Sequence, residues 1–458
     1  MSGALAGQMV GVLGLARSGL AAARLALAQG AQVYASDAAV SAATREAADL
    51  VRELGGEAES GGHDLERLAA CDLIVLSPGI PPDVPLLREP ALAGVPVVAE
   101  VEFAYRFLEA PIIAVTGTNG KTTTTALISH LLQETGIDAP AGGNIGVALS
   151  ELALRDPLPQ LAVVEVSSFQ LGGIREFAPG VGVVTNLAPD HLDRYPSLQA
   201  YYADKARLFL NATPESRWVL NGEDAEVLAL PGYAPGERYL FRVASEPGPD
   251  ERGGYLSSER TLVLRLDDSG EERLLPAAEL SLLGPHNVAN ALAAAIAARL
   301  AGADAEAIVR GLRSFRAPPH RLEPVAERGG VLWINDSKAT NIASTRVALR
   351  SMDRPTLLLL GGRHKGEPYT ELLPELRERV RCVLAFGEAE EQVAKDLEPY
   401  LAVECVPGSF DEVVRRAAEL ARPGDAVLLS PACSSYDMFD NFEERGRRFA
   451  ELAARVNA

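Results

Sequence analysis

The residues best suited to chemistry form a glycine- and threonine-rich loop, Thr116–Thr122, with the sequence TGTNGKT. The loop follows the apolar run Ile112–Val115 and precedes a helical pattern, which places it at a strand-to-helix turn. Backbone N–H groups, the helix dipole and the Lys121 ammonium would hold an anion there, and the Thr122 hydroxyl would be available to Mg²⁺. The usual GxxxxGK[ST] spacing needs a glycine at Val115, so this is a variant phosphate loop. A glycine-containing turn with a surface lysine is the alternative interpretation.

A carboxylate, a histidine and a lysine follow in the same part of the chain. Glu165 lies near the end of the apolar run Leu161–Val166, where a buried charge is costly unless it is paired or metal-bound. A structural salt bridge would satisfy Glu165, but its place beside a phosphate loop favours a Mg²⁺ role. His191, in the run DHLD at 190–193, and Lys205, in a helical pattern, are by themselves interpreted as a capping or packing histidine and a solvated lysine.

The opening of the chain carries a second glycine-rich turn. GLARSG at 14–19 follows the strand pattern Met9–Leu13, and Asp37 follows the next strand pattern, as in a Rossmann dinucleotide fingerprint. Ala16 stands where that fingerprint has its second glycine, so its Cβ weakens an NAD interpretation, although a helix N-terminus still suits a diphosphate. A purely structural turn is the alternative. Ser77-Pro78-Gly79 follows the third strand pattern and would face the same crevice.

Three loops in the last third of the chain each follow an apolar strand pattern. They read NDSKATN at 335–341, GGRHKG at 361–366 and SPACSS at 430–435. Open α/β sheets bind ligands at the loops beyond the carboxyl ends of their strands. Each loop alone is compatible with a turn or a helix cap, but the three together predict a binding face.

The elements that must position these residues alternate between short apolar runs and longer helical patterns, which is typical of βαβ units and an α/β fold. At roughly 150 residues per domain, 458 residues suggest about three domains. We predict a Rossmann-like N-terminal domain at 1–109, a central P-loop ATP-binding domain at 110–317 and a C-terminal Rossmann-like α/β domain at 318–458. Ala317-Pro318-Pro319 is the expected second linker. The Pro- and Gly-rich stretch 231–254 is predicted to be a surface excursion.

Charge and composition limit the possible partners. The chain has 43 Lys and Arg against 62 Asp and Glu, a net charge of −19, which argues against binding to nucleic acid or to an anionic membrane. The four cysteines form no CxxC pair, so neither a disulfide framework nor a zinc site is indicated and a cytoplasmic location is expected. No apolar run approaches the roughly 18 residues of a membrane span, so no membrane insertion is expected. We also expect a monomer.

Taken together, these motifs resemble the Mur ligase family, the ATP-dependent amide ligases of peptidoglycan precursor synthesis, along nearly the whole chain. The variant loop 117–123 is followed, in the family's order, by GNIG at 143–146, EVSSFQ at 165–170, the run 186–194, HNVAN at 286–290 and His320-Arg321. The branch that adds D-glutamate to UDP-N-acetylmuramoyl-L-alanine is resembled best, through SPGI at 77–80, the loop 335–341 and SPACSSYDMF at 430–439. The Asp-Asn-Pro-Arg signature of the diaminopimelate- or lysine-adding branches is absent from the sequence.

The resemblance implies a role for each matching residue. ATP would be held by Gly117, Thr118, Asn119, Gly120, Lys121, Thr122, Thr123, Asn290, Arg321 and Asp336. Two Mg²⁺ ions would be bound, one by Thr122 and Glu165 and the other by His191 and a Lys205 that carries a CO₂-derived carbamate. The UDP-substrate would contact Gly14, Leu15, Ala16, Arg17, Asp37, Ser77, Gly79 and Asn144, and D-glutamate would contact Thr340, Lys365, Ser435 and Phe442. Lys338 would lie near the transferred phosphate and complete a catalytic set with Lys121, Glu165, His191 and Lys205.

The implied reaction starts with phosphorylation of the L-alanyl carboxylate by ATP, and the D-glutamate amine then attacks the acyl phosphate. Three rivals remain at this point. A folate polyglutamate ligase shares the central loop and the reaction type but lacks a UDP-binding first domain. An NAD-dependent oxidoreductase would use the turn 14–19 and Asp37, and a nucleotide-regulated binding module would hydrolyse ATP slowly without an amino-acid cosubstrate.

Overall fold

The structure of the protein, a computed structural model, describes residues 3–80, 84–191, 194–282, 284–316 and 319–456. These residues divide into two compact units, which are described separately. The first unit comprises Met1–Leu187, Gln199–Glu279 and Ala289–Ser314. The second comprises Ala188–Leu198, Leu280–Val288 and Phe315–Ala458.

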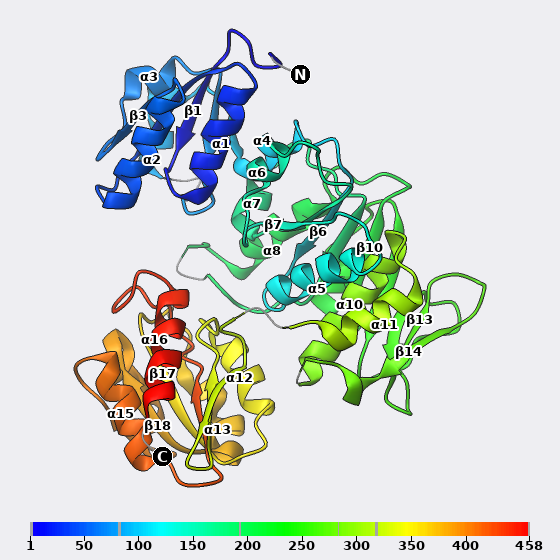
Figure 1. The fold of residues 1–458 in the computed structure, drawn as a ribbon, viewed down its shortest axis with the longest axis vertical. Coiled ribbons are helices and arrows are strands. Elements are labelled where there is room, and N and C mark those ends of the chain that lie inside the picture. Colours follow the sequence, from blue (N-terminus) through cyan, green and yellow to red (C-terminus); the bar gives the residue numbers. More distant parts are fainter. Residues whose placement is uncertain (1–2, 81–83, 192–193, 283, 317–318, 457–458) are drawn as a thin grey trace. The chain divides into compact units, whose positions relative to one another are not determined.

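The first unit opens with a parallel five-stranded sheet in the order β3-β2-β1-β4-β5 (Figure 1). Its strands are β1 Met9–Leu13, β2 Gln32–Asp37, β3 Glu57–Ser60, β4 Leu73–Leu76 and β5 Val97–Ala99. Its helices are α1 Arg17–Ala28, α2 Ala42–Glu53, α3 Leu65–Ala69 and α4 Glu100–Tyr105. The chain runs outward from β1 in both directions, so the loops after β1 and β4 border a topological switch point, where sheets of this kind bind ligands.

A nine-stranded sheet follows in the same unit, in the order β14-β13-β12-β11-β10-β9-β6-β8-β7. Its strands are β6 Ile112–Thr116, β7 Ala141–Gly143, β8 Ala162–Glu165, β9 Val181–Val184, β10 Arg217–Asn221, β11 Glu237–Arg242, β12 Gly253–Leu256, β13 Thr261–Arg265 and β14 Glu272–Pro276. The helices of this region are α5 Lys121–Gln133, α6 Leu149–Ala153, α7 Ser168–Gly172, α8 Leu198–Ala206, α9 Ala225–Ala229, α10 Pro285–Leu300 and α11 Ala305–Ser314. The pairs from β7 to β12 are parallel, and β13 and β14 add antiparallel strands at one edge.

The prediction that 231–254 is a surface excursion was wrong. The segment contributes β11, which pairs with β10, and the start of β12. Tyr239 and Phe241, alternate residues of β11, are buried, because side chains at that spacing point to the same face of a strand. The proline and glycine content of the segment belongs to the turns on either side of β11.

The two sheets of the first unit share one hydrophobic core, in which α1 and α4 pack against α6. The carboxylate of Glu102, which is fully buried, accepts backbone N–H bonds from Arg175, Glu176 and Phe177 at 2.9–3.0 Å. Such bonds offset the cost of burying the charge and tie α4 to the segment after α7.

The second unit is a six-stranded sheet in the order β15-β16-β20-β17-β18-β19, covered by helices on both faces. Its strands are β15 Glu323–Arg328, β16 Val331–Asn335, β17 Thr356–Gly361, β18 Val380–Phe386, β19 Val403–Cys405 and β20 Ala426–Leu429. Its helices are α12 Ile342–Arg350, α13 Leu373–Arg379, α14 Glu390–Leu397, α15 Phe410–Leu420 and α16 Phe442–Arg455. One core joins α12, α13 and α14 to the sheet, and a second core joins α15 and α16 to the opposite face (Figure 1).

This arrangement confirms the predicted α/β fold with parallel-rich sheets. The boundaries at 109/110 and 317/318 stay predictions, and Ala317 and Pro318 of the expected linker lie outside the described residues. Across the described ranges, no helix is both long and apolar enough to cross a membrane.

Candidate active site

The predicted phosphate loop connects β6 to α5 in the first unit (Figure 1). Gly120 is the N-cap residue of α5 with φ 81°, and Gly117 has φ 140°. A Cβ at Gly117 would overlap the Thr185 hydroxyl, and one at Gly120 would lie 2.5 Å from Asn290 Oδ1. Both positions therefore require glycine for backbone conformation and for space.

Two residues at the end of β9 hold the loop from the side. Thr185 Oγ1 donates to the Asn119 carbonyl at 2.6 Å, and Asn186 Nδ2 donates to the same oxygen at 2.9 Å. The Asn119 N–H donates to Asn186 Oδ1 at 2.9 Å. Sequence reasoning missed Thr185 and Asn186 as loop supports, although a Thr-Asn pair directly after an apolar strand was a usable signal. The loop conformation is thus fixed by the neighbouring strand as well as by its own glycines.

Two lysines converge on the loop. Lys121 Nζ donates to the carbonyls of Gly117 and Thr118 at 2.9 and 2.8 Å. Lys205 Nζ, in α8, donates to the Gly117 carbonyl at 2.8 Å and lies 4.7 Å from the centroid of the Tyr201 ring. Lys205 is only 1% exposed, so its interpretation as a solvated lysine was wrong. The two ammonium groups concentrate positive charge where an anion is predicted.

Glu165 ends β8 beside the start of α5 and is 2% exposed. Its Oε2 accepts from Thr122 Oγ1 at 2.7 Å, and its Oε1 accepts from Asn144 Nδ2 at 2.8 Å. Both of these partners are neutral, which differs from the salt bridge offered as the alternative. A carboxylate and a hydroxyl oxygen are hard ligands of the kind Mg²⁺ takes together with phosphate oxygens and waters, so these residues fit the ion. Among the described residues, no group of three or more His, Cys, Asp or Glu could hold a metal.

Two other predicted residues join this cluster. Thr124 Oγ1 donates to Asn290 Oδ1 at 3.3 Å, which places Asn290 of α10 against the phosphate loop, as its predicted nucleotide role requires. Thr123, the last residue of the predicted loop set, is buried in the first turn of α5. Asn144, predicted to contact the muramoyl side of the UDP-substrate, donates to Glu165, and its substrate contact stays a prediction.

The predicted UDP-binding residues of the first sheet meet at the ends of β1, β2 and β4. Ala16 is the N-cap residue of α1, which begins at Arg17. The Asp37 carboxylate accepts backbone N–H bonds from Leu15 and Ala39, both at 2.8 Å. The Ser77 N–H donates to the Leu13 carbonyl at 3.0 Å, which brings the turns that carry Gly14 and Gly79 together. These contacts hold the turns together at the switch point, where the UDP-substrate is predicted to bind. Asp37 also stabilises the turn after β1 through its bond from the Leu15 N–H.

In the second unit the three predicted loops follow β16, β17 and β20, which are parallel neighbours. Asp336 Oδ2 accepts from Ser430 Oγ at 2.8 Å, and its Oδ1 accepts from the Leu322 N–H at 3.2 Å. Burial raises the pKa of Asp336 to about 7, against the opposing effects of these two bonds and of the Arg321 charge. Burial likewise lowers the pKa of His286 to about 4, and Arg321 adds to that shift.

Lys365 lies within a polar cluster formed by these loops. Its Nζ is 3.5 Å from Thr340 Oγ1 and 3.6 Å from Asp190 Oδ1. Asp190 Oδ2 accepts from Asn341 Nδ2 at 2.9 Å. Thr340 and Lys365 therefore lie close together, as expected for residues predicted to bind the same ligand. The sequence motifs contain Asp190 and Asn341, but sequence reasoning did not predict that these residues join the cluster.

The remaining predicted residues of this unit surround the same edge of the sheet. Ser435 is buried in the loop after β20, and Phe442 begins α16. Lys338 Nζ lies 3.8 Å from the centroid of the Phe442 ring, a cation–π contact. His191 has φ 55°, and its Nε2 lies 3.7 Å from Asp190 Oδ2. Leu192 and Asp193, from the same motif as His191, lie outside the described residues.

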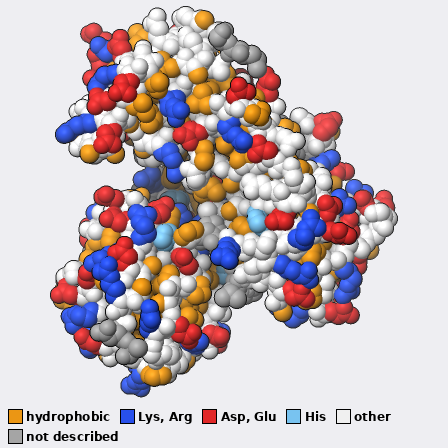
Figure 2. All heavy atoms as spheres, viewed as in Figure 1, with side chains coloured by type: hydrophobic (Ala, Val, Ile, Leu, Met, Phe, Trp, Pro, Cys, Tyr) orange, Lys and Arg blue, Asp and Glu red, His pale blue; other side chains and the backbone are white. Residues whose placement is uncertain are grey.

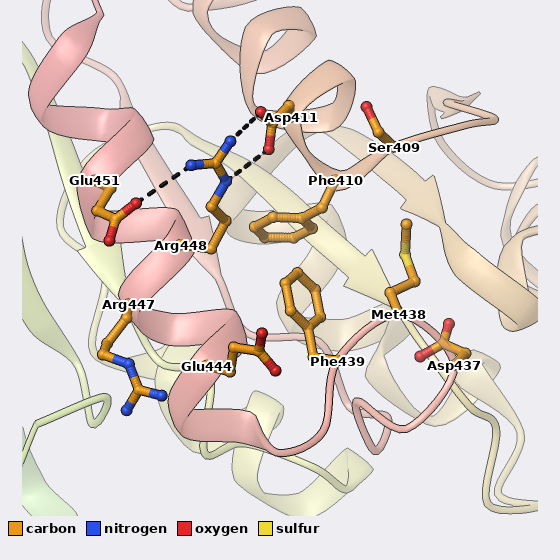
Figure 3. A pocket seen from close by; sticks show the side chains of 10 residues that line it. All are labelled: Ser409, Phe410, Asp411, Asp437, Met438, Phe439, Glu444, Arg447, Arg448 and Glu451. Atoms are coloured by element: carbon orange, nitrogen blue, oxygen red, sulfur yellow. Dashed lines mark hydrogen bonds and ion pairs between the residues drawn. The ribbon is translucent and has the colours of Figure 1, made fainter. Parts of the chain in front are cut away.

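Figures 2 and 3 show other surface features of the molecule. On the face drawn in Figure 2, acidic and basic side chains are interspersed. A groove between α15, α16 and the segment after Tyr436 is shown in Figure 3, where Arg448 pairs with Asp411 and Glu451. The groove is lined by Ser409, Phe410, Asp411, Asp437, Met438, Phe439, Glu444, Arg447, Arg448 and Glu451. None of these is among the residues predicted to bind a ligand.

Three family models match successive parts of the chain. They are the Mur ligase MurD-like N-terminal domain at 8–99, the Mur ligase middle domain at 115–298 and the Mur ligase glutamate ligase domain at 320–433. A UDP-N-acetylmuramoylalanine–D-glutamate ligase of Acidobacterium capsulatum is 41% identical over 98% of this chain and 96% of its own length. The enzyme of the same name from Anaeromyxobacter dehalogenans is 43% identical over 98% of both chains. The crystal structure of UDP-N-acetylmuramate-alanine ligase from Thermotoga maritima has a similar fold, with a TM-score of 0.60, 19% identity and coverage of 97% of this chain and 98% of that one.

Proposed function

The chain belongs to the Mur ligase family, and we propose that it joins D-glutamate to UDP-N-acetylmuramoyl-L-alanine while ATP is converted to ADP and phosphate. The observation that carries this proposal is the full-length similarity, 41–43% identity, to ligases named for that reaction. The positions of the phosphate loop, Glu165 and the Lys365 cluster are compatible with it. The product is an amide of a peptidoglycan precursor.

The chemistry needs an activated acyl group, because the oxide of a carboxylate is a poor leaving group. An oxygen of the L-alanyl carboxylate attacks the γ-phosphorus of ATP, and ADP leaves. The amine of D-glutamate then attacks the carbonyl carbon of the acyl phosphate, loses a proton and expels phosphate. This sequence forms one C–N bond at the cost of one phosphoanhydride bond, so atoms and charges balance.

The phosphate loop is the proposed binding site for the ATP phosphates. Its support by Thr185 and Asn186 and the N-terminus of α5 supply a preorganised set of N–H donors. Lys121, which donates to loop carbonyls in this structure, would turn its ammonium to the phosphoryl group being transferred. Asn290 would contact the nucleotide from α10, and the nucleotide contacts of Arg321 and Asp336 stay predictions.

Thr122 and Glu165 are the proposed protein ligands of one Mg²⁺. Their oxygens lie 2.7 Å apart, and Asn144 holds the carboxylate from the other side. When bound, Mg²⁺ would neutralise negative charge on the phosphates during transfer. The Thr122 hydroxyl and the Asn144 amide hold the Glu165 carboxylate in place from two sides.

We propose that Lys205 carries a carbamate in the active enzyme. The ammonium loses one proton, and the resulting amine adds to CO₂ and loses a second proton to give R–NH–COO⁻. A positive charge is thereby replaced by a negative one, and two protons are released. The buried position of Lys205 at the Gly117 carbonyl supports a role at the phosphate loop rather than in solvent. Lys205→Ala should abolish activity, and partial rescue by a small added carboxylate would support the carbamate. No loss of activity in Lys205→Ala would rule it out. The second Mg²⁺, predicted with His191, stays a prediction.

The second unit is proposed to bind D-glutamate through Lys365, Thr340, Ser435 and Phe442. Lys365 pairs with Asp190 in this structure, so its ammonium is already placed to hold a carboxylate, and the neighbouring Thr340 hydroxyl is available to the same group. Lys338, held on the Phe442 ring, keeps a second cation at this edge of the sheet. The first sheet is proposed to bind the uridine diphosphate at the turn of Gly14 and at Ser77.

The direct experiment measures phosphate release with ATP, Mg²⁺ and UDP-N-acetylmuramoyl-L-alanine, and with D-glutamate, L-glutamate and other amino acids added in turn. We expect D-glutamate alone to stimulate release and to appear in the product by mass spectrometry. Release that requires a folate, or that ignores every amino acid, would refute the proposal in favour of the rivals. We also propose that the enzyme acts as a monomer in the cytoplasm, and sedimentation of the purified protein tests its monomeric state.

A further inference from the structure

The loops after β17 and β20 are tied together by their backbones. The Arg363 N–H donates to the Ser434 carbonyl at 2.9 Å, and the Ser434 N–H donates to the Arg363 carbonyl at 3.2 Å. The first loop continues to Lys365 and the second to Ser435, the two residues from these loops proposed to bind D-glutamate. The distance between those side chains therefore depends on how firmly the two loops are joined.

A side-chain relay joins the same two loops. The hydroxyl of Tyr369, the first residue of the 3₁₀ helix Tyr369–Leu372, lies 3.0 Å from His364 Nδ1 and 2.8 Å from Cys433 Sγ. The rings of His364 and Tyr369 are also in contact, with centroids 5.2 Å apart and planes tilted by 40°. His364 precedes Lys365 in the first loop, and Cys433 stands just before Ser435 in the second.

Two members of the relay, Tyr369 and Cys433, are shielded from solvent, whereas His364 is exposed. Tyr369 is 1% exposed and Cys433 is 0% exposed. Burial raises the pKa of the Tyr369 phenol, and raises that of the Cys433 thiol to about 11, so both groups keep their protons at neutral pH. A protonated phenol donates one hydrogen bond and accepts others, so a single hydroxyl serves both partners. A protonated phenol and a protonated thiol are poor nucleophiles, so these two groups are better suited to positioning the loops than to reacting with a substrate.

We propose that Tyr369 is a positioning residue for D-glutamate, because its hydroxyl, held between His364 and Cys433, sets the spacing between Lys365 and Ser435. The inference rests on the proposed function, in which those two side chains bind the amino acid. A dicarboxylate has its charged ends at a limited range of separations, so it binds well only when its partners are held at a matching distance. None of the three relay residues is among those predicted to hold ATP, so ATP binding should not depend on this relay.

Tyr369→Phe tests the proposal, because it removes the hydroxyl and keeps the ring. We expect the KM for D-glutamate to rise about five- to tenfold, because the hydroxyl bonds both His364 and Cys433 and the loss of a hydrogen bond to a buried group has an effect of this order. The KM for ATP and kcat should change by less than about twofold. KM does not depend on the fraction of protein that is folded, so partial misfolding would lower the apparent kcat without imitating this result.

Tyr239→Phe is the matched control. Its hydroxyl, on a side chain that is also buried, donates to Glu237 at 2.6 Å in β11 of the first unit. We expect no change in the KM for D-glutamate. An equal rise in both variants, or no rise in Tyr369→Phe, would overturn the proposal.

Cys433 supplies a second test of the relay. Cys433→Ala should raise the KM for D-glutamate as Tyr369→Phe does, whereas Cys433→Ser keeps a hydrogen-bonding atom and should remain near the wild type. The double variant Tyr369→Phe/Cys433→Ala should be no worse than Tyr369→Phe alone, since Tyr369→Phe already removes the bond that Cys433→Ala removes. Additive effects would show that the two residues act separately and would overturn the relay.

The wild-type assay separates this inference from the function on which it rests. If D-glutamate does not stimulate phosphate release from the wild type, the proposed function fails and the positioning role fails with it. If D-glutamate stimulates the wild type and Tyr369→Phe leaves its KM unchanged, only the positioning role fails.

Discussion

Replacing Gly120 by alanine should weaken ATP binding by about thirtyfold. Gly120 has φ 81°, and a Cβ there would lie 2.5 Å from Asn290 Oδ1, well inside van der Waals contact. The Asn290 amide must move, which breaks its bond from Thr124 at a cost of about 1 kcal/mol and strains a packed site by at least about 1 kcal/mol more. About 2 kcal/mol corresponds to about thirtyfold in a dissociation constant. Without nucleotide the loop can relax, so the cost appears when ATP requires the native conformation.

Gly136→Ala is the matched control for this prediction. Gly136 follows the same helix, α5, with φ 82°, and a Cβ there would meet nothing within 4 Å. Both variants share the cost of a left-handed alanine, so their difference isolates the contact with Asn290. Titration calorimetry with a non-hydrolysable ATP analogue and Mg²⁺ measures both dissociation constants. Equal values for the two variants would refute the reasoning, since the phosphate loop would then tolerate a displaced Asn290.

Three further predictions concern single charged groups. Glu165→Gln removes the charge, while its amide oxygen can still accept from Asn144 and its amide nitrogen can donate to the Thr122 hydroxyl. The Mg²⁺ concentration for half-maximal phosphate release should rise at least about tenfold, and an unchanged Mg²⁺ dependence would exclude Glu165 as a ligand. Lys365→Met should raise the KM for D-glutamate more than about tenfold and leave that for ATP unchanged, whereas equal effects on both would contradict a role in amino-acid binding. The raised pKa of Asp336, about 7 against the usual 3.8, means that the folded state binds a proton that the unfolded state releases between about pH 4 and pH 7. The stability of the second unit should therefore fall by up to about 4 kcal/mol as the pH rises through that window, and Asp336→Asn should abolish the slope. Urea unfolding, followed by Trp333 fluorescence in a Trp218→Phe background, measures this effect, and an unchanged slope in Asp336→Asn would assign it to another group.

The elements that carry the candidate site were predictable because each combines an apolar strand with the loop that directly follows it. β6 and the phosphate loop are contiguous in the chain, and their function depends on local backbone N–H groups and one helix N-terminus. The same holds for the loops after β16, β17 and β20, which meet because parallel neighbouring strands end at one edge of a sheet. Strand β11 was missed because turn residues on both sides outweighed the alternation of Tyr239 and Phe241 within it.

The sequence by itself thus determined the phosphate loop, the α/β class and which loops carry polar groups, because these follow from short-range patterns of apolar and glycine residues. Only the tertiary structure decided which distant side chains meet. Three pairs of contacting residues are separated by 88 to 175 residues in the chain: Asn290 and Gly120, Lys205 and Gly117, and Asp190 and Lys365. Such contacts depend on strand order and helix packing, since the chain must be folded before these groups come within hydrogen-bonding distance. The burial that raises the pKa of Asp336 and makes Lys205 inaccessible arises in the same way, because exposure is a property of the packed molecule and not of any local sequence.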